Sequence, residues 1–309
     1  ILTGSNNLVV LPNSFLARLG VTNVSRPDDT HLLTLTVRIA PTRMPSVVME
    51  VMRSVLLSCN SIVAEPPPAV ALKSLDAVAL VVELQFRVAS PAERSRARSE
   101  VLDLVYRHCK SAGLLLAMPP ESVVAMTDLP TEKTARPPHV EPIELIEAIP
   151  IFATLTREEK LSLAEAAYAR EFRKDEVIVR QGDLLPALMM VETGVIVMHC
   201  DSQETGRLAP GDFFGETGLL AGMAEAYTLR ALTRVTVYEI DQYAVAPLLA
   251  NRPTLAEELV LSLSRRSLPA QAVVTETLPH DHRAHIFRKA IRRIFHDKPP
   301  VTCHCPLDH

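Results

Sequence analysis

The chain has 309 residues, 48% of them apolar, and a formal net charge of −4 at pH 7. This length is sufficient for two or three modest domains with buried cores. Residues 141–265 carry 11 basic and 20 acidic side chains, whereas residues 1–140 and 266–309 are each slightly basic. The acidic middle excludes a nucleic-acid surface there, because binding to a phosphate backbone requires clustered lysine and arginine.

The cysteines and the apolar runs restrict the class of protein further. Five cysteines, at positions 59, 109, 200, 303 and 305, are scattered and odd in number, which indicates a reducing compartment rather than a disulfide framework. No apolar run approaches the roughly 18 residues that span a bilayer, and no signal peptide is visible. Because the chain begins with Ile1 and not with Met, we expect it to be a fragment whose beginning is missing.

Residues 1–124 predict a small α/β or α+β unit. Strands are indicated by a β-rich run that stops at Pro41 and by a later alternation of apolar and polar residues. Helices are indicated by apolar residues at helical spacing, and by Ser90-Pro91 as a helix start with Gly113 as its stop. The predicted order is strand, helix, strand, helix, over residues 31–41, 44–62, 76–90 and 90–113.

A change of pattern follows residue 124. Residues 125–142 contain four prolines and no apolar period, so they predict a linker. Short strands divided by turn glycines then indicate an all-β barrel or jelly roll. Helices are expected on both sides of these strands, over 141–150, 156–169, 241–251 and 253–266.

The tail, residues 267–309, contains a basic amphipathic helix over 283–295. This helix could contact anionic lipid, although covering an apolar edge of the roll or a neighbouring subunit is the preferred interpretation. The final residues include Cys303, His304, Cys305 and His309, which could hold zinc. A disordered tail is favoured instead, because the spacing lacks a C-x-x-C pair.

Four runs between residues 177 and 241, VIVRQGD, LMMVETGVIVM, GRLAPGDFFGETGLL and YTLRALTRVTVYEID, together resemble the cyclic nucleotide-binding domain. The resemblance covers about residues 145–266 and implies an eight-stranded β-roll with flanking helices. It also implies a ligand-binding cassette made by Phe214, Gly215, Glu216, Thr217, Glu225, Ala226 and Tyr227.

In that family, the residue at Glu216 accepts the ribose 2′-hydroxyl proton, and the glycine at Gly215 lets the backbone approach the ligand. Backbone N–H groups at the helix start then meet the cyclic phosphate. Purely structural roles for these residues are equally consistent with the sequence. Glu216 could cap a tight turn, Tyr227 is expected to pack on the roll rather than stack on a base, and Phe213 and Phe214 are expected in the core.

Glu225 stands where the family has an arginine that pairs with the phosphate. Two unit charges about 4 Å apart interact by about 4 kcal/mol at an effective dielectric constant of 20, so this change of sign weakens binding of cAMP or cGMP severely. Exposure of Glu225 in its loop would reduce the penalty, and Arg230 is not expected to replace the arginine. The roll could therefore bind cAMP or cGMP, bind a different ligand, or be purely structural.

The first residues resemble the cytoplasmic end of small-conductance mechanosensitive, MscS-like channels. The matching features are LVVLPNSFLA, with Pro12 and Asn13 in a turn after a strand, and VTNVSRP, with Asn23, Ser25 and Arg26. The resemblance implies transmembrane helices before Ile1, a seven-fold cytoplasmic ring and a location at the bacterial inner membrane. The alternative for the second motif is a turn stabilised by asparagine and serine side chains.

The favoured function is the cytoplasmic part of a mechanosensitive-type ion channel whose cyclic nucleotide-binding-like domain biases gating. The alternatives are a soluble cyclic nucleotide-responsive regulator and a non-binding, oligomerising roll. No catalytic motif is visible, so we expect no enzyme, metal or cofactor, and no nucleic-acid partner. The expected domains are the end of a β domain, an α/β domain, a linker, a cyclic nucleotide-binding-like domain and a tail, over 1–27, 28–124, 125–142, 143–266 and 267–309.

Overall fold

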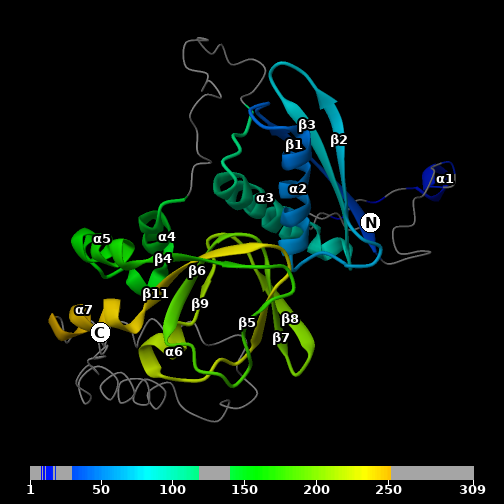
Figure 1. Ribbon diagram of the computed structural model, residues 1–309. Coiled ribbons are helices and arrows are strands. Elements are labelled where there is room, and N and C mark those ends of the chain that lie inside the picture. The colour runs from blue at the N-terminus through cyan, green and yellow to red at the C-terminus, as the bar shows by residue number, and fades with distance from the viewer. Residues whose placement is uncertain are drawn as a thin grey trace.

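The computed structural model describes residues 8, 10, 12–16, 18, 30–117 and 140–251. Figure 1 shows two bodies in contact: an N-terminal region (residues 30–117), built from one sheet and two long helices, and a roll (residues 140–251), built from two sheets. Before them lies a four-residue helix, α1 (Asn13–Leu16). Asn13, expected in a turn after a strand, is thus the first residue of a helix.

The N-terminal region is α+β, because its sheet is wholly antiparallel with the order β1-β3-β2. Its elements are β1 (His31–Ile39), α2 (Pro45–Ser58), β2 (Ala69–Leu75), β3 (Leu80–Val88), the 3₁₀ turn η1 (Pro91–Glu93) and α3 (Arg94–Ser111). The two expected strands and two expected helices are all present. Ser90 precedes η1, but its side chain makes no capping hydrogen bond, and the α-helix itself begins at Arg94.

The strand β2 is the element that the sequence analysis missed. It pairs only with β3, and all but one of its residues are exposed. An edge strand that faces water on both sides lacks the alternation of buried and exposed residues by which strands are recognised. The predicted order of four elements was therefore incomplete.

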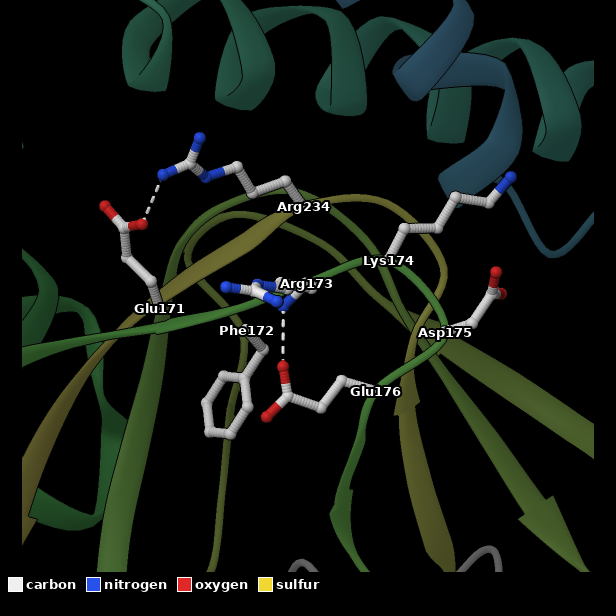
Figure 2. A pocket seen from close by; sticks show the side chains of 7 residues that line it. All are labelled: Glu171, Phe172, Arg173, Lys174, Asp175, Glu176 and Arg234. Atoms are coloured by element: carbon white, nitrogen blue, oxygen red, sulfur yellow. Dashed lines mark hydrogen bonds and ion pairs between the residues drawn. The ribbon is translucent and has the colours of Figure 1, made fainter.

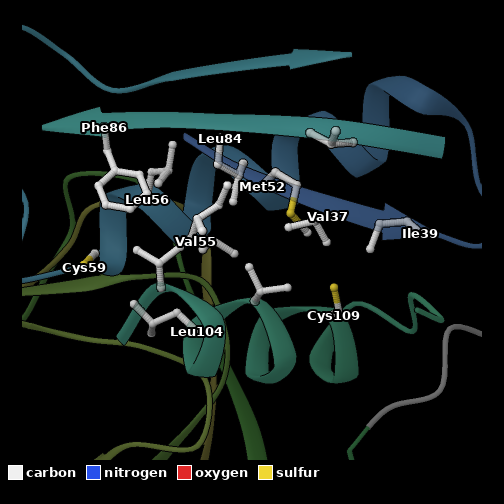
Figure 3. Packing of buried hydrophobic residues seen from close by; sticks show 14 of the residues in the cluster. Val37, Ile39, Met52, Val55, Leu56, Cys59, Leu84, Phe86, Leu104 and Cys109 are labelled. Atoms are coloured by element: carbon white, nitrogen blue, oxygen red, sulfur yellow. The ribbon is translucent and has the colours of Figure 1, made fainter. Parts of the chain in front are cut away.

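The core of the N-terminal region lies between the sheet and α2 and α3 (Figure 3). Alternate residues of β3 point toward the helices, so that Leu84 and Phe86 are at most 1% exposed. They meet Met52 and Leu56, which lie four residues apart on one face of α2. Burying each such side chain contributes about 2 kcal/mol, so this layer fixes the position of both helices against the sheet.

The roll contains the eight strands that the resemblance implies. They form two four-stranded antiparallel sheets, with the orders β5-β10-β7-β8 and β4-β11-β6-β9. The strands are β4 (Tyr168–Phe172), β5 (Val177–Val179), β6 (Ala187–Thr193), β7 (Ile196–Cys200), β8 (Gln203–Leu208), β9 (Phe213–Phe214), β10 (Thr228–Ala231) and β11 (Val235–Asp241). The described helices are α4 (Pro142–Ala148), the turn η3 (Pro150–Phe152), α5 (Arg157–Ala166), α6 (Glu216–Ala221) and α7 (Gln242–Asn251).

The strand β6 explains why the roll has two cores. Leu188 and Met190 pack with the helices α4, α5 and α7, whereas Met189 and Val191 face the interior between the two sheets. A strand covered on both faces reads as an unbroken apolar run rather than as an alternation. The helices on one side of Figure 1 are therefore an integral layer of the roll.

The start of α5 is fixed locally by the sequence. The Thr156 side chain accepts a hydrogen bond from the Glu159 backbone N–H at 3.3 Å, and the Glu159 carboxylate accepts one from the Thr156 N–H at 2.8 Å. This capping box satisfies two backbone donors that the helix leaves unpaired.

The two bodies meet where α3 crosses the end of the roll. Arg107 and Ser111, one helical turn apart, both face the roll: Arg107 bonds the turn before β9, and Ser111 Oγ donates to the Glu192 carbonyl at 2.5 Å. Arg207 of the roll donates its Nη1 hydrogen to the Leu57 carbonyl at 2.6 Å. Ala209 of the roll is 2% exposed and belongs to the apolar core of the N-terminal region.

Several predictions lie outside the described residues: the linker apart from its last three residues, the helix 253–266, the basic helix 283–295, and Asn23, Ser25 and Arg26. Within the part of the chain that the structure describes, none of the helices combines the length and the apolar character required to cross a membrane.

Candidate functional site

The predicted cassette runs from β9 through α6 to the start of β10. Phe213 and Phe214 pair with β6 and are 7% and 6% exposed, and the two rings enter opposite cores of the roll. This confirms the expectation that they are core residues. Gly215 follows with φ +88° and stands immediately before α6, so the helix start that the resemblance implies in the cassette is present.

Gly215 is required by contacts within the protein. A Cβ atom on Gly215 would lie 2.1 Å from the Ala187 carbonyl oxygen, and one on Gly218 would lie 2.1 Å from the Leu185 carbonyl oxygen. The two glycines therefore let α6 lie directly on the segment that leads into β6. Close approach of a ligand, the expected reason for Gly215, is not needed to explain it.

Glu225 lies in the loop between α6 and β10, and the structure corrects the expectation that its side chain can turn to solvent. The loop is tied to the turn before β6 by two backbone hydrogen bonds: Gly182 N–H donates to the Glu225 carbonyl at 2.9 Å, and Glu225 N–H donates to the Asp183 carbonyl at 2.8 Å. The Glu225 side chain is buried, at 9% exposure. Its backbone is thus held on both sides while its carboxyl group points inward.

The carboxyl group of Glu225 is in an unfavourable environment for a charge. Its Oε1 atom is buried and makes no hydrogen bond with the described residues. Burial, and secondly the charge of Glu216, raise the pKa of Glu225 to about 7. Glu225 is therefore partly protonated near neutral pH, and Glu216 lies close enough for the two carboxyl groups to interact.

The other cassette residues have structural roles within the roll. Tyr227 is partly buried against the core between the two sheets, which confirms the expectation that it packs on the roll. Ala226 is also partly buried, and Thr217 accepts a hydrogen bond at its carbonyl from Met223 N–H at 3.3 Å. This bond and the left-handed Gly222 end α6 and turn the chain toward Glu225.

Arg230, as expected, does not replace the family arginine. It is the only lysine or arginine between Phe214 and Ala231. Its side chain is exposed and its Nη1 donates to the Asp175 carbonyl at 2.8 Å, in the turn between β4 and β5. The cassette segment therefore carries two carboxylates and directs its one cation to that turn.

A second candidate is a hollow of about 1130 Å³ at that same turn (Figure 2). It is lined by Glu171, Phe172, Arg173, Lys174, Asp175, Glu176 and Arg234, so its three acidic and three basic side chains balance. Arg234 forms an ion pair with Glu171, and the Glu176 carboxylate accepts the Arg173 backbone N–H. The hollow shares no residue with the cassette, and its balanced charges give it no preference for an anion.

His108 is a buried polar residue that the sequence analysis did not single out. It is 4% exposed, and its Nε2 lies 2.8 Å from Ser58 Oγ of α2. Burial, and secondly the charge of Arg107, lower the pKa of His108 to about 3. The described residues contain no group of three His, Cys, Asp or Glu that could hold a metal ion, so we interpret this pair as a link between α2 and α3.

Residues 169–252 match the family described as the cyclic nucleotide-binding domain, and this part of the chain is such a domain. The match starts at the second residue of β4 and includes the whole cassette. It confirms the fold expected for the second half of the chain. It gives no support to the MscS-like interpretation of the residues before it.

Proteins with different named functions are similar to part of this chain. A protein of Rhodopseudomonas palustris named as a candidate potassium channel is 24% identical over 150 residues, covering 48% of this chain and 36% of that protein. An HTH-type transcriptional regulator, Cmr, of Mycobacterium tuberculosis is 32% identical over 123 residues, covering 38% of this chain and 50% of the regulator. The chain thus spans half or less of the length of these relatives.

A solved structure, the N-terminal domain of a transcriptional regulator from Streptomyces coelicolor, is 24% identical, with a TM-score of 0.36. The matched region covers 40% of this chain and 91% of the chain in that structure.

Proposed function

We propose that this chain is a ligand-responsive regulatory module. The roll binds a small molecule of the nucleoside or nucleotide type at its cassette, and the bound state is passed to the N-terminal region through α3. The family match supports ligand binding at the cassette. The contact between Arg107 and the turn before the cassette supports transmission of the bound state to the N-terminal region.

Arg107 contacts three groups of that turn. Its Nε donates to the Pro210 carbonyl at 2.5 Å, its Nη2 donates to the Ala209 carbonyl at 3.3 Å, and the same Nη2 lies 2.7 Å from Asp212 Oδ1. Asp212 in turn accepts the Ala209 N–H at 2.8 Å, so the turn is closed on itself. A charged side chain with several partners of fixed geometry holds the turn in one arrangement.

The turn leads directly into the cassette, because Asp212 is followed by β9, Gly215 and Glu216. A ligand that shifts α6 therefore acts on the turn, and through it on Arg107. A ligand can shift the turn between a free and a ligand-bound arrangement only by the difference between its binding free energies for the two. By the same coupling, a change in the N-terminal region alters the affinity of the cassette for the ligand.

Hydrogen exchange tests this coupling without any ligand. The change Arg107→Ala should speed amide exchange in β9 and α6, although Arg107 belongs to the other body. The exposed Arg98, on the same helix, provides the matched control, and Arg98→Ala should leave the cassette unchanged. Unaltered exchange over residues 213–221 in Arg107→Ala would show that the two bodies are independent.

For the effector, we propose the channel interpretation as one candidate. It rests on the sequence resemblance at Pro12, Asn13, Asn23, Ser25 and Arg26, although Asn13 begins a helix and not a turn. The similarity of 150 residues of this chain to a protein named as a candidate potassium channel agrees with it. It predicts that the full-length protein is recovered from the inner membrane as a seven-fold assembly, measured by native mass spectrometry. Recovery as a DNA-binding dimer would instead support the soluble regulator, for which the similarity to Cmr is the supporting observation.

A further inference from the structure

We propose that the cassette takes an uncharged ligand that donates hydroxyl hydrogens, an unphosphorylated nucleoside, in preference to a cyclic phosphate. This inference rests on the proposed function, in which the cassette is the ligand site, and it names the chemical class of the ligand. It is carried by Glu225 and Glu216, and by the apolar surface beside them.

The first observation is the unsatisfied acceptor. Glu225 Oε1 is buried, the backbone N–H and carbonyl of Glu225 are both hydrogen-bonded, and no described residue donates to Oε1. Buried polar atoms in folded proteins are nearly always hydrogen-bonded, so an orphan at a binding segment indicates a donor from outside the chain. The pKa of Glu225 is about 7, so the ionised form is present at and above neutral pH. In that form the carboxylate offers only acceptor positions, and the group that satisfies it donates hydrogen.

The second observation is the sign of the charge. Glu216 lies close enough to Glu225 to interact with it electrostatically. Between Phe214 and Ala231 the sequence has no lysine or arginine other than Arg230, whose guanidinium is bonded to the Asp175 carbonyl. An anionic phosphate would meet two carboxylates and no cation of that segment, whereas ribose hydroxyls would meet two acceptors.

The third observation is apolar surface at the same loop. Leu184 and Met223 are 55% and 41% exposed. Leu184 pairs with Ala224, the residue between Met223 and Glu225, so the two exposed side chains lie on the two segments that meet at the Glu225 loop. A ligand with hydroxyl donors at one end and a flat, weakly polar ring at the other fits this arrangement, because the ring would cover exposed apolar surface.

A metal cation is a less suitable occupant. Two carboxylates alone provide fewer ligands than hard cations such as Mg²⁺ or Ca²⁺ require. The described residues contain no group of three potential metal ligands.

Isothermal titration calorimetry on the whole chain tests the ligand class, with adenosine, guanosine, cAMP and cGMP as probes. We expect one of the nucleosides to bind more tightly than its cyclic phosphate by at least about tenfold. Cyclic phosphates that bind as tightly as the nucleosides would overturn the inference but leave the sensing function intact. Absence of binding by all four compounds would overturn both, and would favour a purely structural roll.

Variants distinguish a ligand contact from a general effect. Glu225→Gln keeps the shape of the side chain but adds a donor, so it should weaken nucleoside binding by about tenfold or more. Glu225→Arg should remove nucleoside binding and strengthen cAMP binding. Glu165→Gln, an exposed acid on α5, should change neither affinity. Melting temperatures of all three variants separate loss of binding from loss of folding, and unchanged nucleoside affinity in a folded Glu225→Gln variant would contradict the proposal.

Discussion

His108 of the N-terminal region and Glu225 of the roll are both buried titratable side chains, and they differ in whether the side chain is hydrogen-bonded. Ser58 donates its only hydrogen to the Ser54 carbonyl at 2.7 Å, so the neutral His108 ring donates from Nε2 to Ser58 Oγ at 2.8 Å. Glu225 of the roll has no partner for Oε1 among the described residues. His108 is thus hydrogen-bonded within the fold. Glu225 Oε1 is one of four buried side-chain atoms of the described residues without a partner, and it is the one of these that lies in the cassette.

The largest expected effect tests whether the cassette depends on close backbone contact. Gly215→Ala places a methyl group 2.1 Å from the Ala187 carbonyl oxygen at φ +88°, so we expect a loss of about 4 kcal/mol from overpacking and backbone strain. Gly182→Ala is the control, since Gly182 has the same φ with no atom within 4 Å of the added methyl group, and it should lose about 1 kcal/mol. Urea unfolding measures both. Equal losses of stability in the two variants would show that the positive φ angle, and not the contact with Ala187, is the reason for glycine at position 215.

The next prediction concerns His108 and low pH. The pKa of His108 is lowered from 6.5 to about 3, so the unfolded chain binds its proton first and stability falls as the pH drops from 6.5 toward 3. Between pH 7 and pH 4 this group should remove about 3 kcal/mol from the free energy of unfolding. His108→Gln should flatten that part of the curve. An unchanged acid slope in the variant would mean that His108 is already protonated in the folded protein.

Glu225 should give the opposite pH dependence. Its pKa is raised from 4.5 to about 7, so the folded chain holds the proton more tightly and stability falls as the pH rises from 4.5 to 7. Glu225→Gln should therefore raise the free energy of unfolding by about 3 kcal/mol at pH 8 and change it little at pH 4. Denaturation at the two pH values measures the difference, and equal effects would argue against a buried carboxyl group.

The smallest expected effect separates two of the polar contacts that α3 makes with the roll, those of Lys110 and Arg107. Lys110 and Glu144 lie 2.5 Å apart, but their side chains are 50% and 45% exposed, so Lys110→Ala should cost less than about 0.5 kcal/mol. Arg107→Ala should cost about 1–2 kcal/mol, because it removes several bonds at a partly buried site. A double-mutant cycle with Asp212→Asn measures the Arg107 contribution. Equal costs for the two alanine variants would mean that Arg107 holds the turn no more firmly than a surface ion pair.

Much of the fold could be predicted from the sequence. Turn glycines and apolar runs predict the all-β character of the roll, and the resemblance to the cyclic nucleotide-binding domain implies its eight strands. The elements α2, α3, β1 and β3 follow from apolar periodicity and helix-end signals. The edge strand β2 could not be recognised, because exposure on both faces removes the periodic signal. The α3–roll contact could not be predicted either, since Arg107 looks in the sequence like any other arginine of a basic helix.

The sequence by itself determined the scaffold and the reversed charge at position 225, because turn chemistry and apolar periodicity are local properties of the chain. Only the tertiary structure decided that Glu225 is buried with an unsatisfied oxygen beside Glu216, and that Gly215 serves contact with Ala187. Burial and close approach depend on segments distant in the sequence, here the turn before β6, and no local pattern encodes which segments meet.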